Sequence, residues 1–136
     1  MISFEIEGEP VGKGRPKFSS RGGFARAYTP KKTIDYEKKV KECYIDQIGT
    51  KFECALRVEI TAFYPIPKST SKKNRVKMLR DEIRCTKKPD IDNIAKIILD
   101  ALNGVAYEDD KQVVSIEVNK MYGEVPKVAV SLLDLC

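Results

Sequence analysis

The sequence predicts an α+β fold, in which a mixed β-sheet is covered by packed helices. Three observations support this prediction: four segments alternate apolar and polar residues, three carry apolar residues at helical spacing, and the chain has 136 residues. That length is enough for one hydrophobic core and too short for two comfortable ones. We therefore expect one domain over residues 1–136.

Four segments are predicted as strands because apolar and polar side chains alternate along them. They span residues 2–7, 56–64, 112–122 and 127–133. Gly123 and Pro126 mark a turn between the last two. The positions expected to share a face are Leu56, Val58, Ile60 and Ala62 in the second segment, Val114, Ile116 and Val118 in the third, and Val128, Val130 and Leu132 in the fourth.

Two helices are predicted before the acidic part of the chain. The first runs from Thr33, its expected N-cap, to about Ile48, where Gly49 stops it. The second is a short basic helix from Ser71, also an expected N-cap, to about Ile83. Residues expected to point inward are Tyr36, Val40, Cys43, Tyr44 and Ile48 in the first helix, and Val76, Leu79 and Ile83 in the second.

The third helix has the clearest pattern. Pro89 biases the preceding residue away from helix, so the chain should stay extended up to Asp92, which would cap the helix. Asn103 and Gly104 supply its C-terminal stop. Its apolar stripe consists of Ile94, Ile97, Ile98, Ala101 and Leu102.

Residues 8–32 are predicted to form a long loop. They hold five of the eight glycines and three of the seven prolines, and they leave room for a hairpin around residues 19–23. A loop of this length in a small domain is more often functional than not.

Charge is distributed in blocks. Residues 12–41 carry ten basic residues against two acids, and residues 68–88 carry nine against two. Residues 89–110 carry six acids and one lysine, although the whole chain has a net charge of +5. Two basic stretches beside an acidic one suit a polyanion held near bound cations. The alternative interpretation is a pair of solvated basic faces.

The residue types exclude several kinds of chemistry. The chain has no histidine, so hydrolases and nucleases that use a histidine base are excluded unless a partner supplies one. Its four cysteines form no C-x-x-C pair, so we expect reduced thiols in a cytoplasmic protein and no structural zinc. We see neither a secretory signal nor a membrane span.

The acidic stretch predicts a metal site. Asp90 and Asp92 can project to one side of an extended chain, and Lys96 follows Asp92 by one helical turn, opposite the apolar stripe. Asp110 stands before the third strand, where it could approach the start of the helix. Three converging carboxylates would bind Mg²⁺ or Mn²⁺, which activate water for attack at phosphorus, while Lys96 offsets charge. The alternative is that these residues have only structural roles. Asp92 would be an N-cap and Asp90 a turn residue, Lys96 would form an i,i+4 pair, and Asp109 and Asp110 would lie in a solvated turn.

The sequence also resembles a known family. The string KPDIDNIAKIILDALNGVAYEDDKQV is similar to the motif of the RusA-type Holliday junction resolvases, small endodeoxyribonucleases common in bacterial genomes and prophages. The resemblance extends to GKGRPKF, YTPKKTIDYE and PIPKSTSKK, and so covers nearly the whole chain.

The resemblance implies both site residues and an assembly. Asp90, Asp92 and Asp110 would be the metal-binding acids, Lys96 the essential lysine, and Asp109 a substitute for Asp110. It implies a homodimer that uses two Mg²⁺-dependent sites to make symmetric nicks in opposing strands of a four-way DNA junction.

We therefore expect a RusA-like domain that resolves Holliday junctions in DNA recombination and repair. DNA contacts are expected from the long loop, whose Phe18, Phe24 and Tyr28 would stack on bases or pack against the body. Two other functions remain open: a non-catalytic branched-DNA-binding module, and a metal-dependent phosphoesterase for small substrates. The basic residues expected to contact DNA are Lys13, Arg15, Lys17, Arg21 and Arg26.

Overall fold

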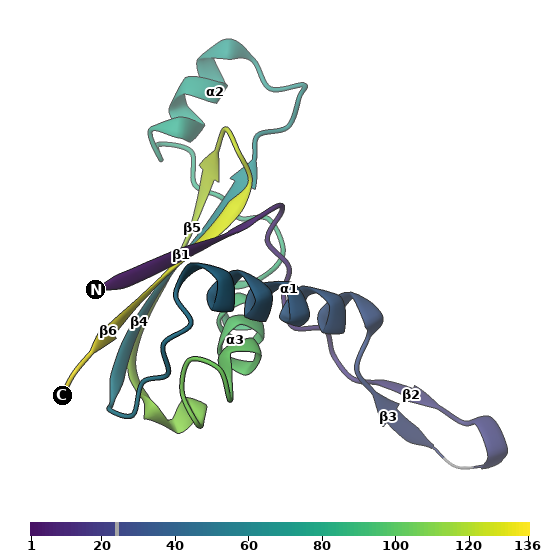
Figure 1. Ribbon diagram of the computed structural model, residues 1–136. Coiled ribbons are helices and arrows are strands. Elements are labelled where there is room, and N and C mark those ends of the chain that lie inside the picture. Colours follow the sequence, from purple (N-terminus) through teal and green to yellow (C-terminus); the bar gives the residue numbers. More distant parts are fainter. Residues whose placement is uncertain (24) are drawn as a thin grey trace.

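The computed structural model describes residues 1–23 and 25–136, apart from the side chain of Arg21, so Phe24 lies outside the described residues. The predicted α+β class is confirmed (Figure 1). Among the described residues, no helix combines the length and apolar composition of a membrane span. The elements are β1 (Ile2–Glu7), β2 (Lys17–Ser19), η1 (Arg21–Gly23), β3 (Arg26–Tyr28), α1 (Lys31–Gln47), β4 (Leu56–Pro65), α2 (Lys72–Leu79), α3 (Ile91–Leu102), η2 (Asp110–Gln112), β5 (Val113–Gly123) and β6 (Lys127–Asp134).

The main sheet of the described residues has the strand order β1-β6-β4-β5. β6 runs antiparallel to both β1 and β4, whereas β4 and β5 are parallel. A parallel pair needs a long crossover, and residues 66–112 supply it with α2, α3 and η2. α1 and α3 contact each other on one side of the sheet (Figure 1).

β4 forms the centre of the core. Every second residue from Leu56 to Tyr64 is buried, as the alternation predicts. The apolar stripe predicted for the third helix is also buried, from Ile94 to Leu102 along α3. Full burial stabilises a side chain of this size by about 1.5–3 kcal/mol, so the contact between α3 and the sheet is a main source of stability.

Two expected N-caps are wrong. α1 begins at Lys31 after Pro30, so Thr33 lies inside the helix; it is buried, and its hydroxyl accepts a hydrogen bond from the Gly14 backbone N–H at 3.1 Å. α3 begins at Ile91, so its N-cap is Asp90 and not Asp92. Both helices start earlier than predicted. Lys31, directly after Pro30, is the first residue of α1, and Asp90, directly after Pro89, is the N-cap of α3.

α2 is shorter and more exposed than predicted. Ser71 caps it as expected, accepting a hydrogen bond from the Asn74 N–H, but the helix ends at Leu79. Val76 and Leu79 are 47% and 38% exposed, so the inward positions predicted for them are wrong. α2 lies near one end of the sheet, where it contacts β5 and only Met78 of the helix packs against the core (Figure 1).

The long loop contains the hairpin for which the sequence left room. β2 and β3 pair antiparallel, with Phe18 opposite Ala27, and η1 forms the turn between them. The hairpin projects from the body on the side remote from α2 (Figure 1).

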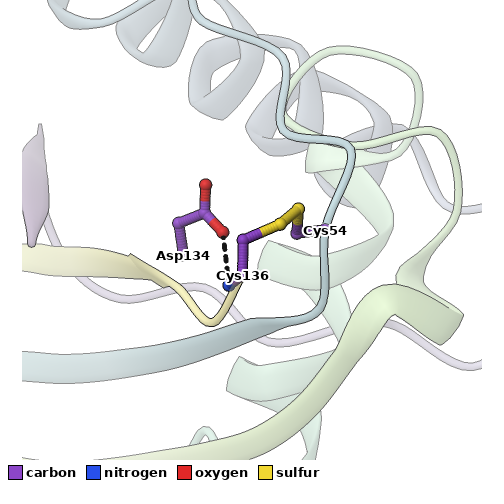
Figure 2. A group of neighbouring side chains, drawn as sticks. All are labelled: Cys54, Asp134 and Cys136. Carbon is purple, nitrogen blue, oxygen red and sulfur yellow. Dashed lines mark hydrogen bonds between the residues drawn. A yellow bond between two sulfur atoms is a disulfide. The ribbon is translucent and has the colours of Figure 1, made fainter.

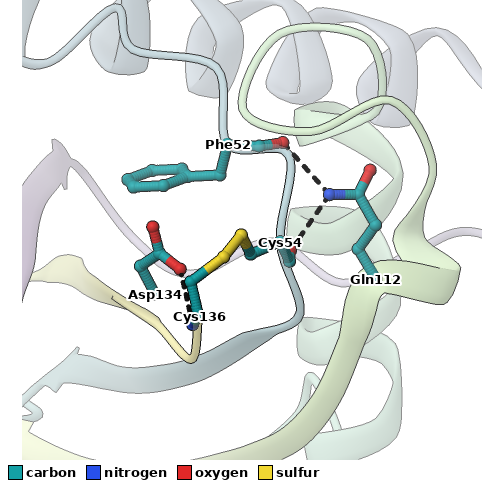
Figure 3. The surroundings of a disulfide bond; sticks show 5 residues. All are labelled: Phe52, Cys54, Gln112, Asp134 and Cys136. Atoms are coloured by element: carbon teal, nitrogen blue, oxygen red, sulfur yellow. Dashed lines mark hydrogen bonds between the residues drawn. A yellow bond between two sulfur atoms is a disulfide. The ribbon is translucent and has the colours of Figure 1, made fainter.

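The prediction of four reduced cysteines is wrong for one pair. Cys54 and Cys136 form a disulfide with a Cα–Cα distance of 5.6 Å, while Cys43 and Cys85 are free. The reason is strand register: β4 and β6 pair Leu56 with Asp134, and continuing that pairing by two residues brings the two cysteines together (Figure 3). Their separation of 82 residues hides this neighbourhood in the sequence.

The core contact of α3 can be tested with two isoleucines of the same helix. Ile98→Ala removes a fully buried side chain and should lower the free energy of unfolding by about 2–4 kcal/mol. Ile91→Ala is the matched control, because Ile91 is 47% exposed and its loss should cost less than about 0.5 kcal/mol. Urea unfolding measures both, and equal losses would contradict this assignment of the buried face.

Candidate active site

Asp90 and Asp92 lie at the N-terminus of α3. Asp90 is the extended N-cap residue, and Asp92 belongs to the first helical turn, so the prediction that both project from extended chain is wrong. The Asp90 side chain makes no capping hydrogen bond. Both carboxylates are exposed at the positive end of the helix dipole, a position that favours negative charge.

Lys96 lies on the exposed face of α3. It follows Asp92 by one turn and precedes Asp100 by another, while the apolar stripe faces the sheet. Lys96 forms no ion pair with any residue that the structure describes. The expected placement of Lys96, above Asp92 and opposite the stripe, is confirmed, and its ammonium group is open to a ligand.

Asp110 lies near the other end of α3. The charge of Asp100 and the side chain of Asn103 both affect the pKa of Asp110, which places Asp110 near these two residues. Asp100 follows Asp90 by ten residues, which corresponds to about 15 Å along a helix axis. Among the described residues, no group of metal-ligand side chains within 4.8 Å of one another contains any of these three acids, so the structure does not bring Asp110 together with Asp90 and Asp92 in one chain.

The fold-back after α3 explains the position of Asp110. The Tyr107 hydroxyl donates a hydrogen bond to the Leu99 carbonyl at 2.6 Å, which draws the following segment back onto the helix. Burial raises the pKa of Asp110, and the neighbouring charges of Asp109 and Asp100 act in the same direction.

Asp109 has a structural role that distinguishes it from Asp110. It is the N-cap of η2, and its carboxylate accepts a hydrogen bond from the Lys111 N–H at 3.0 Å, which lowers the pKa of Asp109. The sequence contained a signal for this role, because Asp109 and Gln112 have the spacing of a capping box. Of the two acids left open by the sequence, Asp110 is the one without a capping role.

Gln112 connects this turn to the body and was not identified from the sequence. Its side-chain oxygen accepts a hydrogen bond from the Glu108 N–H at 2.9 Å. Its side-chain N–H group donates to the carbonyls of Phe52 and Cys54 at 3.0 and 3.2 Å (Figure 3). The loop that carries Asp110 is thus attached to the segment before β4.

A cleft runs from the N-terminal loop to Asp90. We call it the N-terminal cleft; it has a volume of about 830 Å³. The loop approaches α3 closely, since the Lys13 N–H donates to the Asn93 carbonyl at 2.9 Å. A Cβ at Gly12 would lie 2.6 Å from the Pro89 Cβ, so glycine is required there. The charged residues lining the cleft include Lys13, Arg15, Lys17, Lys32, Lys88 and Asp90.

Lys13 is held by two carboxylates. Its ammonium nitrogen lies 2.9 Å from Glu37 of α1 and 3.1 Å from Asp100 of α3. Burial by itself lowers the pKa of Lys13, but the hydrogen bonds to these two acids raise it overall. Lys13 therefore ties the loop to both helices, a role that differs from the phosphate contact expected for it.

The other predicted DNA-binding residues are distributed over the loop and the hairpin. Arg15 and Lys17 line the N-terminal cleft and are exposed, and Arg26 is exposed on β3. Arg21 lies in η1 at the hairpin turn, but its side chain falls outside the described part of the chain. Phe18 and Tyr28 of the hairpin are 75% and 50% exposed, so neither ring is buried against the body.

Two side chains of the sheet hold the segment that delivers Asp90. The hydroxyl of buried Tyr64 donates to the Pro89 carbonyl at 2.6 Å, and Lys120 of β5 donates to the Lys87 carbonyl. The Lys120 ammonium also lies 5.4 Å from the centre of the Tyr64 ring. Burial raises the pKa of Tyr64, which keeps the hydroxyl protonated as a donor. Sequence periodicity placed Tyr64 at a strand end and gave no signal for this contact.

Within the described residues, one cluster brings three metal-ligand side chains within 4.8 Å of one another. It consists of Cys54, Asp134 and Cys136 (Figure 2). Its two sulfurs are bonded to each other, and Asp134 accepts a hydrogen bond from the Cys136 N–H at 2.9 Å. This cluster is unrelated to the predicted acids, which do not assemble to that distance in one chain.

Comparison with known proteins identifies the family of the chain. The family model for endodeoxyribonuclease RusA matches residues 7–133. The chain is also 37% identical over 142 residues to a protein of Bacillus subtilis strain 168 named "Uncharacterized protein YqaN", covering 98% of this chain and 96% of that protein. The matched range includes the N-terminal cleft, α3 and the turn that carries Asp110. The chain belongs to the RusA endodeoxyribonuclease family, whose members are divalent-metal-dependent nucleases that act on Holliday junctions.

Proposed function

We propose that this protein is a Mg²⁺-dependent, structure-selective endonuclease that resolves Holliday junctions by paired symmetric nicks. The observation that carries the proposal is the N-terminal cleft, in which basic side chains lead directly to Asp90. Such a cleft attracts a phosphate backbone and ends at carboxylates suited to hard cations. The proposed setting is recombination and repair in the cytoplasm, with residues 1–136 acting as one RusA-like domain.

The acids at both ends of α3 have the donor chemistry of a Mg²⁺ site. Asp90, Asp92 and Asp110 offer carboxylate oxygens, and neither Asp90 nor Asp110 serves as a side-chain cap. A cation bound there would supply Lewis-acid activation of water and of the phosphate, and Mn²⁺ would substitute for Mg²⁺. Asp90 and Asp92 would hold their carboxylates at the helix N-terminus, beside the phosphate in the cleft.

Lys96 would contribute a fixed positive charge. It is exposed, it has no ion-pair partner in the described part of the chain, and it lies one turn from Asp92. A charge in that position can orient a non-bridging phosphate oxygen and stabilise the negative charge that develops in the transition state.

A homodimer would complete the site. Asp110 interacts with Asp100, which follows Asp90 by ten residues, or about 15 Å along the helix axis. Among the described residues, no metal-ligand group within 4.8 Å contains Asp90, Asp92 or Asp110. A second copy would therefore present its own Asp110 beside Asp90 and Asp92. This arrangement would also give two equivalent sites for paired nicks.

The hairpin would contact the open centre of the junction. Arg15, Lys17, Arg21 and Arg26 would bind phosphates, while Lys13 positions the loop through its ion pairs. Phe18 is 75% exposed on β2, where its ring is available to stack on an unpaired base.

Asp92→Asn tests the nuclease proposal. It keeps the size of the side chain but removes a carboxylate, so nicking of a synthetic four-way junction should fall at least about a hundredfold, while junction binding persists. Gel analysis with Mg²⁺ or EDTA, beside a linear duplex of matched sequence, measures both. Glu82→Gln, a change of an exposed acid, is the control. Junction binding without nicks in Mg²⁺ or Mn²⁺ by the wild type would reject catalysis.

Mixing two inactive variants tests whether the site is shared. Asp92→Asn and Asp110→Asn should each be inactive as homodimers. In a mixed dimer, a shared arrangement leaves one of the two sites with all of its acids, so coexpressed chains should recover nicking of one strand. If each site belonged to one chain, every site in the mixed dimer would lack an acid. No recovery in mixed dimers isolated with two different tags would contradict the shared site.

Tyr64→Phe tests the support of Asp90. It removes only the hydroxyl that bonds to the Pro89 carbonyl, and it should raise the Mg²⁺ concentration for half-maximal nicking on the order of tenfold. Tyr44→Phe is the control, because the hydroxyl of buried Tyr44 donates to the Thr50 carbonyl and not to the segment that precedes α3. Both changes should cost about 1 kcal/mol of stability by urea unfolding. Equal Mg²⁺ requirements in both variants would contradict a positioning role.

A further inference from the structure

A second groove reaches Asp90 from the side of β5. We call it the β5 groove; its volume is about 540 Å³, and its lining includes Arg84, Asp90, Ile91, Asn119 and Lys120. Asp90 therefore lines both this groove and the N-terminal cleft. The Arg84 side chain pairs with Asp81 at 2.7 Å but remains 77% exposed. DNA whose phosphate lies at Asp90 could therefore extend into either the N-terminal cleft or the β5 groove.

The strand that lines the β5 groove also contacts α2, which belongs to a strongly basic segment. Residues 68–80, which include α2, carry six basic residues and no acid. α2 buries no residue, and none of these cations is in an ion pair with a residue that the structure describes. The six are Lys68, Lys72, Lys73, Arg75, Lys77 and Arg80.

The charge pattern of α2 differs from that of a merely solvated helix. α1 is also largely exposed on one side, but its lysines alternate with four acids: Asp35, Glu37, Glu42 and Asp46. In α2, Lys73 and Lys77 are one turn apart with the same charge, an arrangement that destabilises an isolated helix. A bound polyanion relieves this repulsion.

The position of α2 identifies which part of the DNA it would meet. α2 and the β2–β3 hairpin project from opposite ends of the molecule (Figure 1). Asp90 lines the N-terminal cleft together with Lys17 of the hairpin, and it lines the β5 groove together with residues of β5, the strand that α2 contacts. Duplex DNA has a persistence length of about 50 nm, so bending a duplex in the cleft toward α2 would cost elastic free energy. A branched molecule presents a second arm in another direction without this bending energy.

We propose that α2 and the β5 groove bind a second duplex arm, so that α2 determines the preference for branched over linear DNA. The proposal rests on the nuclease function proposed above and assigns to α2 a role that catalysis itself does not require. The ligand is the phosphate backbone of the arm, which is recognised by charge and direction and not by base sequence.

The test compares two matched pairs of lysines in the full-length protein. Lys73→Gln/Lys77→Gln removes two positive charges from α2. Glutamine is a good helix former, so the helix itself should persist. Lys38→Gln/Lys41→Gln removes two exposed charges from α1 as the control. Dissociation constants are measured in EDTA, over a range of salt concentrations, for a four-way junction and for a linear duplex of the same arm sequence. Circular dichroism and the urea midpoint verify that each variant is folded.

The α2 variant should bind the junction on the order of tenfold more weakly, and its logarithmic salt slope should fall by about 1–2. Its affinity for linear duplex and both affinities of the α1 variant should stay within about twofold of wild type. Equal losses on junction and duplex, or no loss on either, would overturn the role of α2 while leaving the nuclease function intact. A wild type that neither prefers nor nicks the junction would overturn the proposed function itself.

Discussion

The parallel pairing of β4 and β5 is the constraint on which the rest of the molecule depends. Two parallel neighbours cannot be joined by a tight turn, so the chain must leave the end of β4 and return to the start of β5. That crossover contains α2, the segment before Asp90, α3 and the turn with Asp110. The candidate active site is therefore carried by the connection, while the sheet supplies the rigid support.

The support is specific at both ends of the crossover. Tyr64, near the end of β4, holds the Pro89 carbonyl, and Lys120 of β5 holds the Lys87 carbonyl. At the return, Gln112 bonds to the carbonyls of Phe52 and Cys54 just before β4. Each contact restrains backbone near an acid of the candidate site. Asp90 and Asp92 are exposed and form no ion pair with a residue that the structure describes. Exposed carboxylates on a fixed backbone suit a hard cation.

The N-terminal loop is attached to the same helix by a different kind of interaction. Lys13 bridges Glu37 of α1 and Asp100 of α3, and Gly12 and Gly14 permit backbone approaches that a Cβ would block. The loop thereby forms one wall of the N-terminal cleft and leads into the projecting hairpin. The ion pairs of Lys13 and the close backbone contacts together fix the position of the loop. Arg15 and Lys17, which follow Lys13, therefore line the same cleft as Asp90.

The sequence by itself determined the periodic features: four strands near their observed bounds, the buried stripe of α3, the hairpin, and the acids and lysine that carry the family resemblance. These depend on local spacing, which a helix or strand converts directly into a face. Only the tertiary structure decided the long-range features. These are the starts of α1 and α3, which precede the caps predicted at Thr33 and Asp92, and the exposure of α2. They also include the pairing of Cys54 with Cys136 and the separation of Asp110 from Asp90. Each of these depends on which distant segment lies opposite, and that is set by strand register and helix position, neither of which leaves a mark in local spacing.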